Sequence, residues 1–247
     1  MNPNLHYSRS PLTEAVIDVR VALPDTITLE TLAQIQAGQE DNYPTRKNAI
    51  SVQGQLSFDP DVPPATGSRT HMGYRFVSQD ERQVIQARRD GFTFSRLAPY
   101  ESWESFRAEG QRWWLRYREF TQPKTIQRVA VRYINRLDLP LPLNDFKDYL
   151  RTVPEVSPDM SQELDGYFMQ LRLPQPDLKA MLLLNEALIP PPPAPPTVSV
   201  LLDIDLFREV EPPQTEAELW NFFELLRQRK NQIFEACITE VMRELIR

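Results

Sequence analysis

The stretch RVAVRYINRLDLP, residues Arg128–Pro140, decides the fold of this chain. It begins shortly after Pro123, where a tryptophan-rich helical segment has to end. Polar side chains such as Arg132 and Asn135 are mixed with valine, tyrosine and isoleucine. This mixture predicts a strand at the centre of a sheet that has one polar face. The segment Leu12–Val21 (LTEAVIDVRV) repeats the pattern, which indicates two similar halves.

Further strands are predicted on both sides of this stretch, wherever apolar residues recur with strand spacing. They are Leu12–Val21, Ala49–Phe58, Thr70–Val77, Arg82–Arg89, Phe92–Leu97, Glu163–Leu173, Leu178–Leu188 and Val198–Phe207. Asp90-Gly91 between two of these strands is typical of a hairpin turn. The prolines and the glycine of segment 59–68 argue against a regular element there. The six prolines of segment 189–197 predict an extended loop between neighbouring strands.

Helices are predicted at Thr28–Gln36, Glu101–Phe120, Asn144–Leu150 and from Glu216 to about Ile246. The second of these carries aromatic residues at intervals of three and four, which form one stripe. We therefore expect Trp103, Phe106 and Trp113 to be buried against a sheet, and Trp114 beside them to be partly exposed.

The last predicted helix begins at a capping-box pair, Thr215 and Glu218. A polar run, RQRKNQ at 227–232, interrupts its apolar stripe. Such a run is usually solvated, and it can also mark a bend or a contact with a partner.

Together these elements predict a single α+β domain, residues 1–247, that is a pseudo-duplication with halves 12–121 and 125–247. Each half has the order β-α-β-β-(β)-α. We expect the halves to form one curved antiparallel sheet with the two long helices on one face.

Composition excludes several classes of protein. Of the 247 residues, 41% are hydrophobic and 25% are charged, which is typical of an ordered globular protein. The net charge of −6 argues against nonspecific nucleic-acid binding. No apolar run approaches the length of a membrane helix and no signal peptide is evident, so we expect a cytoplasmic protein. The single cysteine, Cys237, forbids an internal disulfide.

Motifs for catalysis or cofactor binding are absent from the sequence. The seven glycines never form a dinucleotide-binding or phosphate-binding loop. The two histidines, His6 and His71, together with one cysteine, cannot form a His/Cys zinc site. We therefore expect no cofactor and no bound metal.

Three segments resemble a sporadically distributed family of uncharacterised bacterial proteins. The family opens with Pro-Leu-x-Glu-Ala-Val, matched here by Pro11–Val16, and carries a central Arg-Tyr-x-Asn-Arg strand, matched within Arg128–Arg136. It closes with Phe-x-x-x-Ile-Thr, matched by Phe234–Thr239. Ala130 stands where glycine is usual. The patchy distribution of the family resembles that of mobile or defence-type accessory genes.

The polar face of the central strands is the predicted ligand site. Positions two or four apart in a strand share a face, so Arg132 and Arg136 point to one side, as do Asp203 and Asp205. Arg20 is included from the equivalent first strand. Asn135 falls on the opposite alternation and is included only for its place in the family motif. Paired charges would make this face structural, whereas unpaired arginines in a cleft would bind anions.

These patterns favour a non-enzymatic binding protein, for a small anionic ligand or a protein partner, over an enzyme. The alternative is a metal-dependent enzyme whose carboxylates hold Mg²⁺ and whose arginines hold a phosphorylated or anionic substrate. A third hypothesis is an interaction subunit that uses the proline run or segment 227–232 as its contact surface. A homodimer is compatible with each of these functions.

Overall fold

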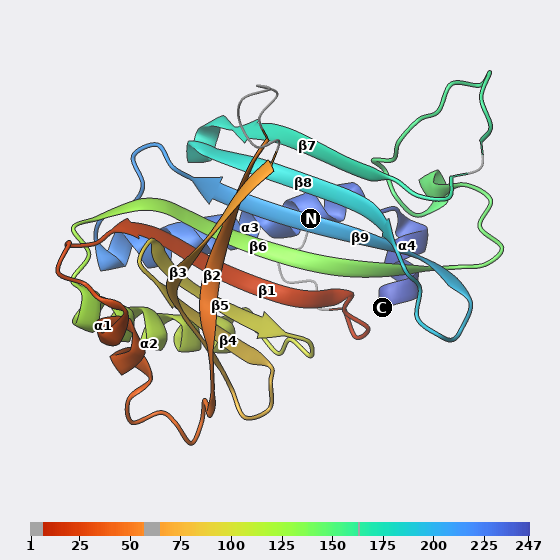
Figure 1. Ribbon diagram of the computed structural model, residues 1–247. Helices are drawn as coiled ribbons and strands as arrows, with labels where there is room; N and C mark the ends of the chain where they lie inside the picture. The colour runs from red at the N-terminus through yellow and green to blue at the C-terminus, as the bar shows by residue number, and fades with distance from the viewer. Residues whose placement is uncertain (1–6, 57–64, 163) are drawn as a thin grey trace. The chain divides into compact units, whose positions relative to one another are not determined.

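The computed structural model describes residues 7–56, 65–162 and 164–247. Within them the chain is an α+β protein with a nine-stranded antiparallel sheet and four α-helices (Figure 1). The strand order is β2-β3-β4-β5-β1-β6-β9-β8-β7. The predicted fold class, α+β with an antiparallel sheet, is confirmed.

The strands are β1 (Leu12–Ala22), β2 (Thr45–Leu56), β3 (Ala65–Val77), β4 (Gln83–Arg88), β5 (Gly91–Leu97), β6 (Thr125–Pro140), β7 (Phe168–Gln175), β8 (Ala180–Ile189) and β9 (Thr197–Arg208). The α-helices are α1 (Leu29–Ala33), α2 (Trp103–Thr121), α3 (Glu216–Cys237) and α4 (Glu240–Ile246). The described residues also form the short 3-10 helices η1 (Gln34–Gln36), η2 (Phe146–Asp148) and η3 (Pro176–Leu178).

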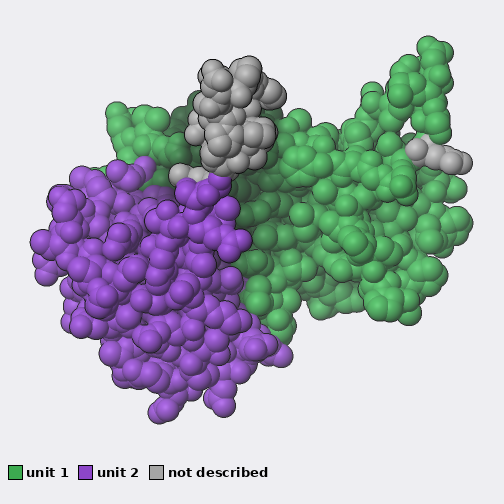
Figure 2. Space-filling model, in the orientation of Figure 1, with its two compact units in different colours: residues 1–17, 97–100, 128–247 green, residues 18–96, 101–127 purple. Residues whose placement is uncertain are grey.

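The chain folds into two compact units (Figure 2). Unit 1 comprises the described part of Met1–Ile17, with Leu97–Tyr100 and Arg128–Arg247. Unit 2 comprises Asp18–Arg96 and Glu101–Gln127. Since β1 contributes residues to both units, their boundaries do not coincide with the halves 12–121 and 125–247.

The core of unit 2 is built around the aromatic side of α2. Trp103, Phe106 and Trp113 are buried, as the stripe predicts. Trp114 is also buried, with 1% of its surface exposed, so the expected partial exposure is wrong. Its ring lies 5.8 Å from the ring of Phe92 on β5, which extends the core beyond the predicted stripe.

The hairpin between β4 and β5 is confirmed, although its turn lies one residue earlier than predicted. Arg88 pairs with Gly91, so Arg89 and Asp90 form the two-residue loop. Gly91 has a φ of +154°, and a Cβ atom there would lie 2.4 Å from the carbonyl oxygen of Val19. Glycine at this position therefore allows the backbones to approach closely within unit 2.

The core of unit 1 lies between the sheet and α3, which runs behind β6 and β9 in Figure 1. On β9, Val200, Leu202, Ile204 and Leu206 are all fully buried, which confirms the alternation predicted for this strand. The guanidinium of Arg208 lies over the Phe222 ring of α3, at 5.2 Å from the ring centroid. The Thr215–Glu218 capping box is present at the start of α3.

The C-terminal segment is two helices, and the prediction of one continuous helix to Ile246 is wrong. Ile238, between α3 and α4, has an extended backbone (φ −110°, ψ 154°) and forms a β-bridge with Leu150. Thr239 then caps α4, because its side chain accepts a hydrogen bond from the Met242 amide. Its own amide donates to the carbonyl oxygen of Tyr149, 2.9 Å away. The bridge satisfies backbone groups that a helix would use internally.

Two further predictions need correction. The predicted helix Asn144–Leu150 is the short 3-10 helix η2, capped by Asp145 rather than by Asn144. In segment 59–68, β3 already begins at Ala65, where it continues its pairing with β2, and residues 59–64 lie outside the described residues.

The structure agrees with the predictions for the proline run and for membrane-spanning segments. The proline run connects β8 to β9, which are neighbouring strands, as predicted. Within the described residues, no helix is long and apolar enough to cross a membrane.

Candidate functional site

The pairing of β6 with β9 determines which of the predicted site residues share a face. Arg132 lies opposite Asp205, and Ile134 lies opposite Asp203. Even-numbered positions of β6 therefore share a face with odd-numbered positions of β9. We call this the polar face of unit 1; it comprises Gln170, Asn185, Arg128, Arg132, Arg136, Asp138, Ser199, Asp203 and Asp205.

Arg132 and Asp203 form the central contact of the polar face. The arginine Nε and Nη2 atoms donate to the two carboxylate oxygens of Asp203 at 2.8 and 2.7 Å. The side chain of Asp203 is 2% exposed, whereas that of Arg132 is 47% exposed. The hydrogen bond to Asp203 raises the pKa of Arg132, despite partial burial.

A line of amide side chains holds Asp203 from its other side. Asn185 on β8 donates to the Asp203 Oδ2 atom at 2.9 Å. Gln170 on β7 in turn donates to the Asn185 Oδ1 atom at 2.7 Å. The contacts run across four adjacent strands, β7, β8, β9 and β6. They fix the orientation of the Asp203 carboxylate, and through it the guanidinium of Arg132.

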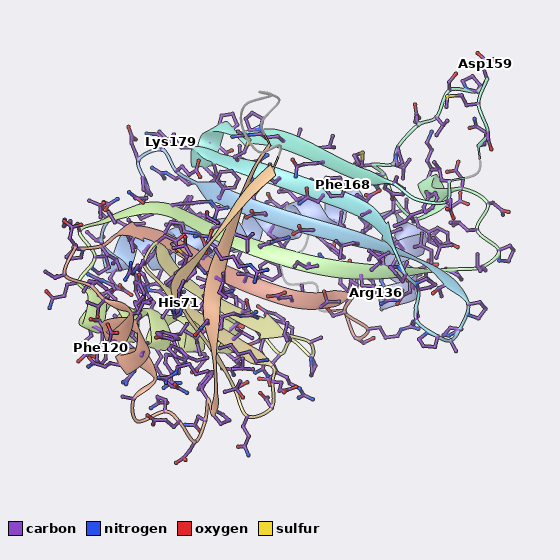
Figure 3. The ribbon with its side chains drawn as sticks, in the orientation of Figure 1. His71, Phe120, Arg136, Asp159, Phe168 and Lys179 are labelled. Carbon is purple, nitrogen blue, oxygen red and sulfur yellow. The ribbon has the colours of Figure 1, made fainter. Side chains whose placement is uncertain are left out.

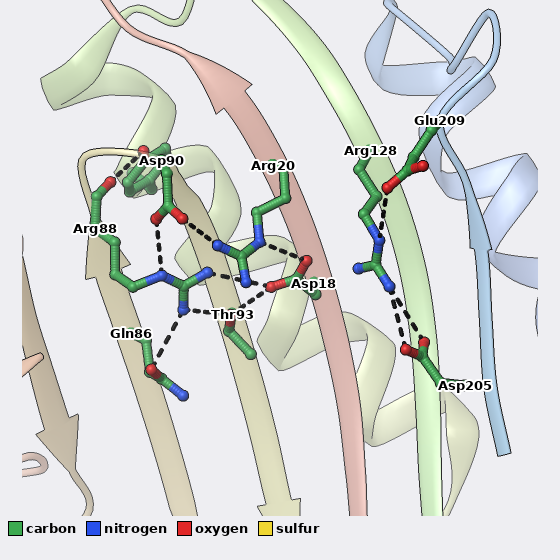
Figure 4. A network of polar contacts seen from close by, with 10 residues as sticks. Asp18, Arg20, Gln86, Arg88, Asp90, Thr93, Arg128, Asp205 and Glu209 are labelled. Carbon is green, nitrogen blue, oxygen red and sulfur yellow. Dashed lines mark hydrogen bonds and ion pairs between the residues drawn. The ribbon is translucent and has the colours of Figure 1, made fainter. Parts of the chain in front are cut away.

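Arg128 has carboxylate partners of its own. Its Nη2 atom lies 3.2 Å from an Asp205 oxygen, and its Nε atom lies 3.6 Å from Glu209, as Figure 4 shows. Arg128 was not among the predicted residues, although it has the same alternation as Arg132. Asp205 therefore pairs with the arginine four positions before the one that it faces.

Arg136 pairs along its own strand. Its Nε atom donates to Asp138 at 2.9 Å, and its Nη2 atom donates to Ser199 at 3.1 Å and to the Pro190 carbonyl at 3.2 Å. Figure 3 shows Arg136 near one end of the strand. This contact anchors the start of the proline run to β6.

Asn135 lies on the opposite face and is not brought together with the predicted site. It is buried, and its Nδ2 atom donates to the Leu202 carbonyl oxygen at 3.1 Å. The position agrees with its alternation, so Asn135 supports the core of unit 1 and does not line the polar face.

Arg20 belongs to a second cluster, in unit 2 (Figure 4). It donates to Asp18 at 3.1 Å and also contacts Asp90. Arg88 donates to Asp18 at 3.2 Å and to Asp90 at 2.9 Å, and Thr93 donates to Asp18 at 2.7 Å. We call these five residues the Asp18 cluster.

Each arginine of the predicted site therefore has a carboxylate partner. Because paired charges indicate a structural role, we assign that role to Arg20 and Arg136. Arg132 differs in two respects. Its side chain is the most exposed of the three, at 47% against 38% for Arg20 and 30% for Arg136, and among the described residues it forms a salt bridge with one carboxylate, whereas Arg20 is shared between Asp18 and Asp90. Among the described residues, no group accepts a hydrogen bond from its Nη1 atom.

A pocket in unit 2 was not predicted. It has a volume of about 480 Å³, and its lining includes Tyr43, Gln83, Glu109 and Arg112. The Tyr43 hydroxyl donates to Glu109 at 3.0 Å, and the Trp113 indole donates to the same carboxylate at 2.9 Å. Burial on its own would raise the pKa of Glu109, but the hydrogen bonds and charge of Arg112, together with the hydrogen bonds from Tyr43 and Trp113, outweigh it and lower the pKa. Tyr43 and Glu109 come from distant segments, so no local motif points to this pocket.

Two titratable groups of unit 1 were also missed, one buried in the core and one partly buried on α3. Glu186 on β8 is 1% exposed and accepts a hydrogen bond from the Tyr167 hydroxyl at 2.7 Å. Burial raises the pKa of Glu186 to about 7. Lys230 lies within the polar run 227–232, and its Nζ atom sits 3.9 Å from the centroid of the Tyr133 ring. Burial lowers the pKa of Lys230 to about 7.

The donors needed by the metal-dependent alternative are not gathered in the described part of the chain. Asp203 and Asp205 are each engaged with an arginine. No group of three or more histidine, cysteine, aspartate or glutamate side chains among the described residues is placed to hold a metal ion. His71 contacts the Gly73 carbonyl oxygen and the ring of Tyr74, and His6 lies outside the described residues.

No protein-family model matches this chain, and no curated protein has a significantly similar sequence. The resemblance to the sporadically distributed bacterial family stays a prediction from the three segments that carry it.

Proposed function

We propose that the protein is a non-enzymatic binding protein that holds a small anionic ligand on the polar face of unit 1, with Arg132 as the principal contact. The observation that supports this proposal is the unequal burial of one ion pair. The Asp203 side chain is 2% exposed and that of Arg132 is 47% exposed. Pairing with a solvent-exposed group adds little net stability, so this pair leaves the exposed side of the Arg132 guanidinium accessible to a ligand.

The arrangement resembles a preorganised hydrogen-bond donor. Two guanidinium nitrogens of Arg132 are fixed by Asp203, which Asn185 and Gln170 hold in turn. The remaining donors of a planar guanidinium can meet a phosphate or carboxylate oxygen without further ordering of the side chain. Because Asp203 already balances the charge of Arg132, we expect directional hydrogen bonding rather than net charge to supply the affinity.

A thermal-shift assay with nucleotides and phosphorylated metabolites tests this function. A ligand at 100 times its Kd stabilises a protein by about 2.7 kcal/mol. For a chain of this size, that corresponds to a rise of roughly 5–10 °C in Tm. Arg132→Lys keeps the charge and loses the planar fork, so we expect the shift to disappear in this variant.

Arg20→Lys is the matched control, because Arg20 is a similarly exposed arginine paired with aspartate in the other unit. We expect this variant to keep the ligand response of the parent protein. The proposal fails if no anion of the panel shifts the parent Tm, or if Arg132→Lys retains the full shift.

The order of the strands supports a duplication, which we also propose. In the strand order, β1 is followed outward by β5, β4, β3 and β2, while β6 is followed outward by β9, β8 and β7. Each half thus places its first strand innermost and continues in reverse order. An experimental structure in which residues 12–121 superpose on 125–247, with both long helices on one sheet face, would support this origin.

The expected role as an accessory of a mobile or defence-type gene system also stays a hypothesis. It rests on the family resemblance alone. Knowledge of the neighbouring genes tests it directly, because unrelated housekeeping neighbours in several genomes would contradict it.

A further inference from the structure

Strand β7 is at one edge of the sheet, and its backbone on that side has no strand partner among the described residues. The register with β8 shows which groups face outward. The Leu188 amide donates to the Tyr167 carbonyl at 3.2 Å, in line with the pairing of Phe168 with Ala187. In an antiparallel pair, positions alternate between bonding to the partner and pointing away. The outward backbone groups of β7 are therefore those of Phe168, Gln170, Arg172 and Pro174.

Pro174 agrees with this assignment. Proline lacks an amide hydrogen, so within a sheet it is tolerated where its nitrogen faces the open edge. At Pro174 no hydrogen bond to β8 is lost. As far as the described residues show, the amides of Phe168, Gln170 and Arg172 are the donors that remain available along the edge.

The side chains of β7 continue the apolar layer of unit 1 to this edge. Leu182 and Leu184 on β8 are buried, and they pair with Leu173 and Leu171 on β7. Leu173 is 42% exposed, so the layer ends uncovered. On the other face of the strand, Phe168 is 69% exposed, and Figure 3 shows it along β7. Exposed apolar side chains beside an open sheet edge are typical of strand addition.

We propose that two copies of this chain pair through β7, antiparallel and related by a two-fold axis, so that their sheets become continuous. The charge pattern selects the register. A pairing centred on Arg172 would place this arginine opposite its own copy, which is unfavourable. A pairing centred on Leu171 instead places Gln170 opposite Arg172, and Met169 opposite Leu173. In that register the outward groups form about six backbone hydrogen bonds between the copies.

The other edge strand, β2, is less suited to this pairing. It carries Arg46 and Lys47 as adjacent exposed residues. Charged side chains on an edge strand oppose the addition of another strand. In β7 the only charged residue is Arg172, and the register centred on Leu171 gives it a neutral neighbour.

Analytical ultracentrifugation of the full chain tests the proposal first. We expect a concentration-dependent dimer. Arg172→Pro removes an outward amide and leaves the bonds to β8 intact, so it should yield a monomer with an unchanged circular dichroism spectrum. Val52→Asp changes an exposed residue on β2 and should leave the dimer intact. A parent chain that stays monomeric, or a folded Arg172→Pro variant that still dimerises, overturns the proposal.

Hydrogen exchange on the parent chain gives a reading that does not depend on a variant. In a monomer, the amides of Met169 and Leu171 are protected by β8, while those of Gln170 and Arg172 exchange freely. We expect protection of Gln170 and Arg172 to appear as the concentration is raised into the dimer range. A dimer without this change must form through another surface, which overturns the proposal even if Arg172→Pro fails to fold.

Discussion

Each unit has a cluster in which arginine pairs with aspartate. The two clusters differ in the exposed fractions of the paired side chains. In unit 2, the side chains of Arg88 and Asp18 are 10% and 12% exposed, and all three guanidinium nitrogens of Arg88 have acceptors. In unit 1, Asp203 is enclosed while Arg132 is half-exposed, and its Nη1 atom has no acceptor among the described residues. The enclosed Arg88–Asp18 pair stabilises its unit, whereas an anchored and exposed arginine such as Arg132 can also bind a ligand.

Loss of Asp18 should give the largest effect. In Asp18→Ala, buried Arg88 and Thr93 lose their shared acceptor, and a buried charge is left with fewer partners. We expect the free energy of unfolding to fall by about 3–5 kcal/mol, measured by urea denaturation. Glu101→Ala is the control, because Glu101 is an exposed partner of Arg96, and its loss should cost about 1 kcal/mol or less. Equal costs for the two variants would show that the Asp18 cluster is not a closed structural element.

Glu186 and Lys230, which have shifted pKa values and no ion-pair partner among the described residues, should make stability depend on pH. The pKa of Glu186 is about 7 in the folded chain and ordinarily 4.5. Between these values the folded state binds more protons, so stability falls as pH rises from 4.5 to 7. The pKa of Lys230 is about 7 and ordinarily 10.5. Here the unfolded state binds more protons, so stability rises from pH 7 to 10.5.

The stability contributed by these two groups together should therefore be lowest near pH 7. It should rise on each side by on the order of 3–4 kcal/mol, once the Lys230 side is discounted for the partial exposure of that residue. Glu186→Gln should flatten the acidic side and Lys230→Met the alkaline side, in urea midpoints measured across pH. The neighbouring charge of Arg227 lowers the pKa of Lys230 further, and that of Glu235 raises it. A Lys230→Met profile identical to that of the parent would mean that this amine is solvated in the folded chain.

The pair in unit 1 should respond unequally to removal of its two members. Arg132→Gln leaves the buried Asp203 carboxylate with Asn185, so we expect a loss of about 2–3 kcal/mol. Asp203→Asn leaves Arg132 able to turn to water, so we expect about 1 kcal/mol. Calorimetric Tm values of both variants test this order. The reverse order would mean that Arg132 depends on Asp203 for its own burial. The pair in unit 1 would then be structural, like the Asp18 cluster in unit 2.

The alternation of β6 and β9 was readable from the sequence because strand periodicity needs no tertiary information. It placed Arg132 and Arg136 on the same face of β6, and Asp203 and Asp205 on the same face of β9. The partners were not readable, because the offset between two strands decides that Arg132 binds Asp203 while Arg128 binds Asp205. The alternation of side chains within one strand does not determine its register with the neighbouring strand.

Helix patterns failed where distant segments intervene. The apolar stripe of the last helix continues through Cys237 to Ile246, so apolar periodicity does not mark the break at Ile238, which Leu150 stabilises by a β-bridge. The local signal is Thr239, the N-cap of α4, which sequence reasoning passed over. Lys230 lies in a polar run but continues the buried side of α3, between Leu226 and Phe234. Its long apolar stem makes such a position tolerable, and composition alone cannot show it.

The smallest effect expected is that of Arg20, and it sharpens the comparison within one cluster. The Arg20 side chain is 38% exposed, and its partner Asp18 keeps Arg88 and Thr93 when Arg20 is replaced. No buried charge is left alone in Arg20→Gln, so we expect a loss of at most about 1 kcal/mol by urea denaturation. The loss should shrink further at high salt, because an exposed pair is screened and a buried pair is not. A cost as large as that of Asp18→Ala would show that Arg20 is part of the closed structural core, and that exposure alone does not distinguish the arginine that binds from those that only stabilise.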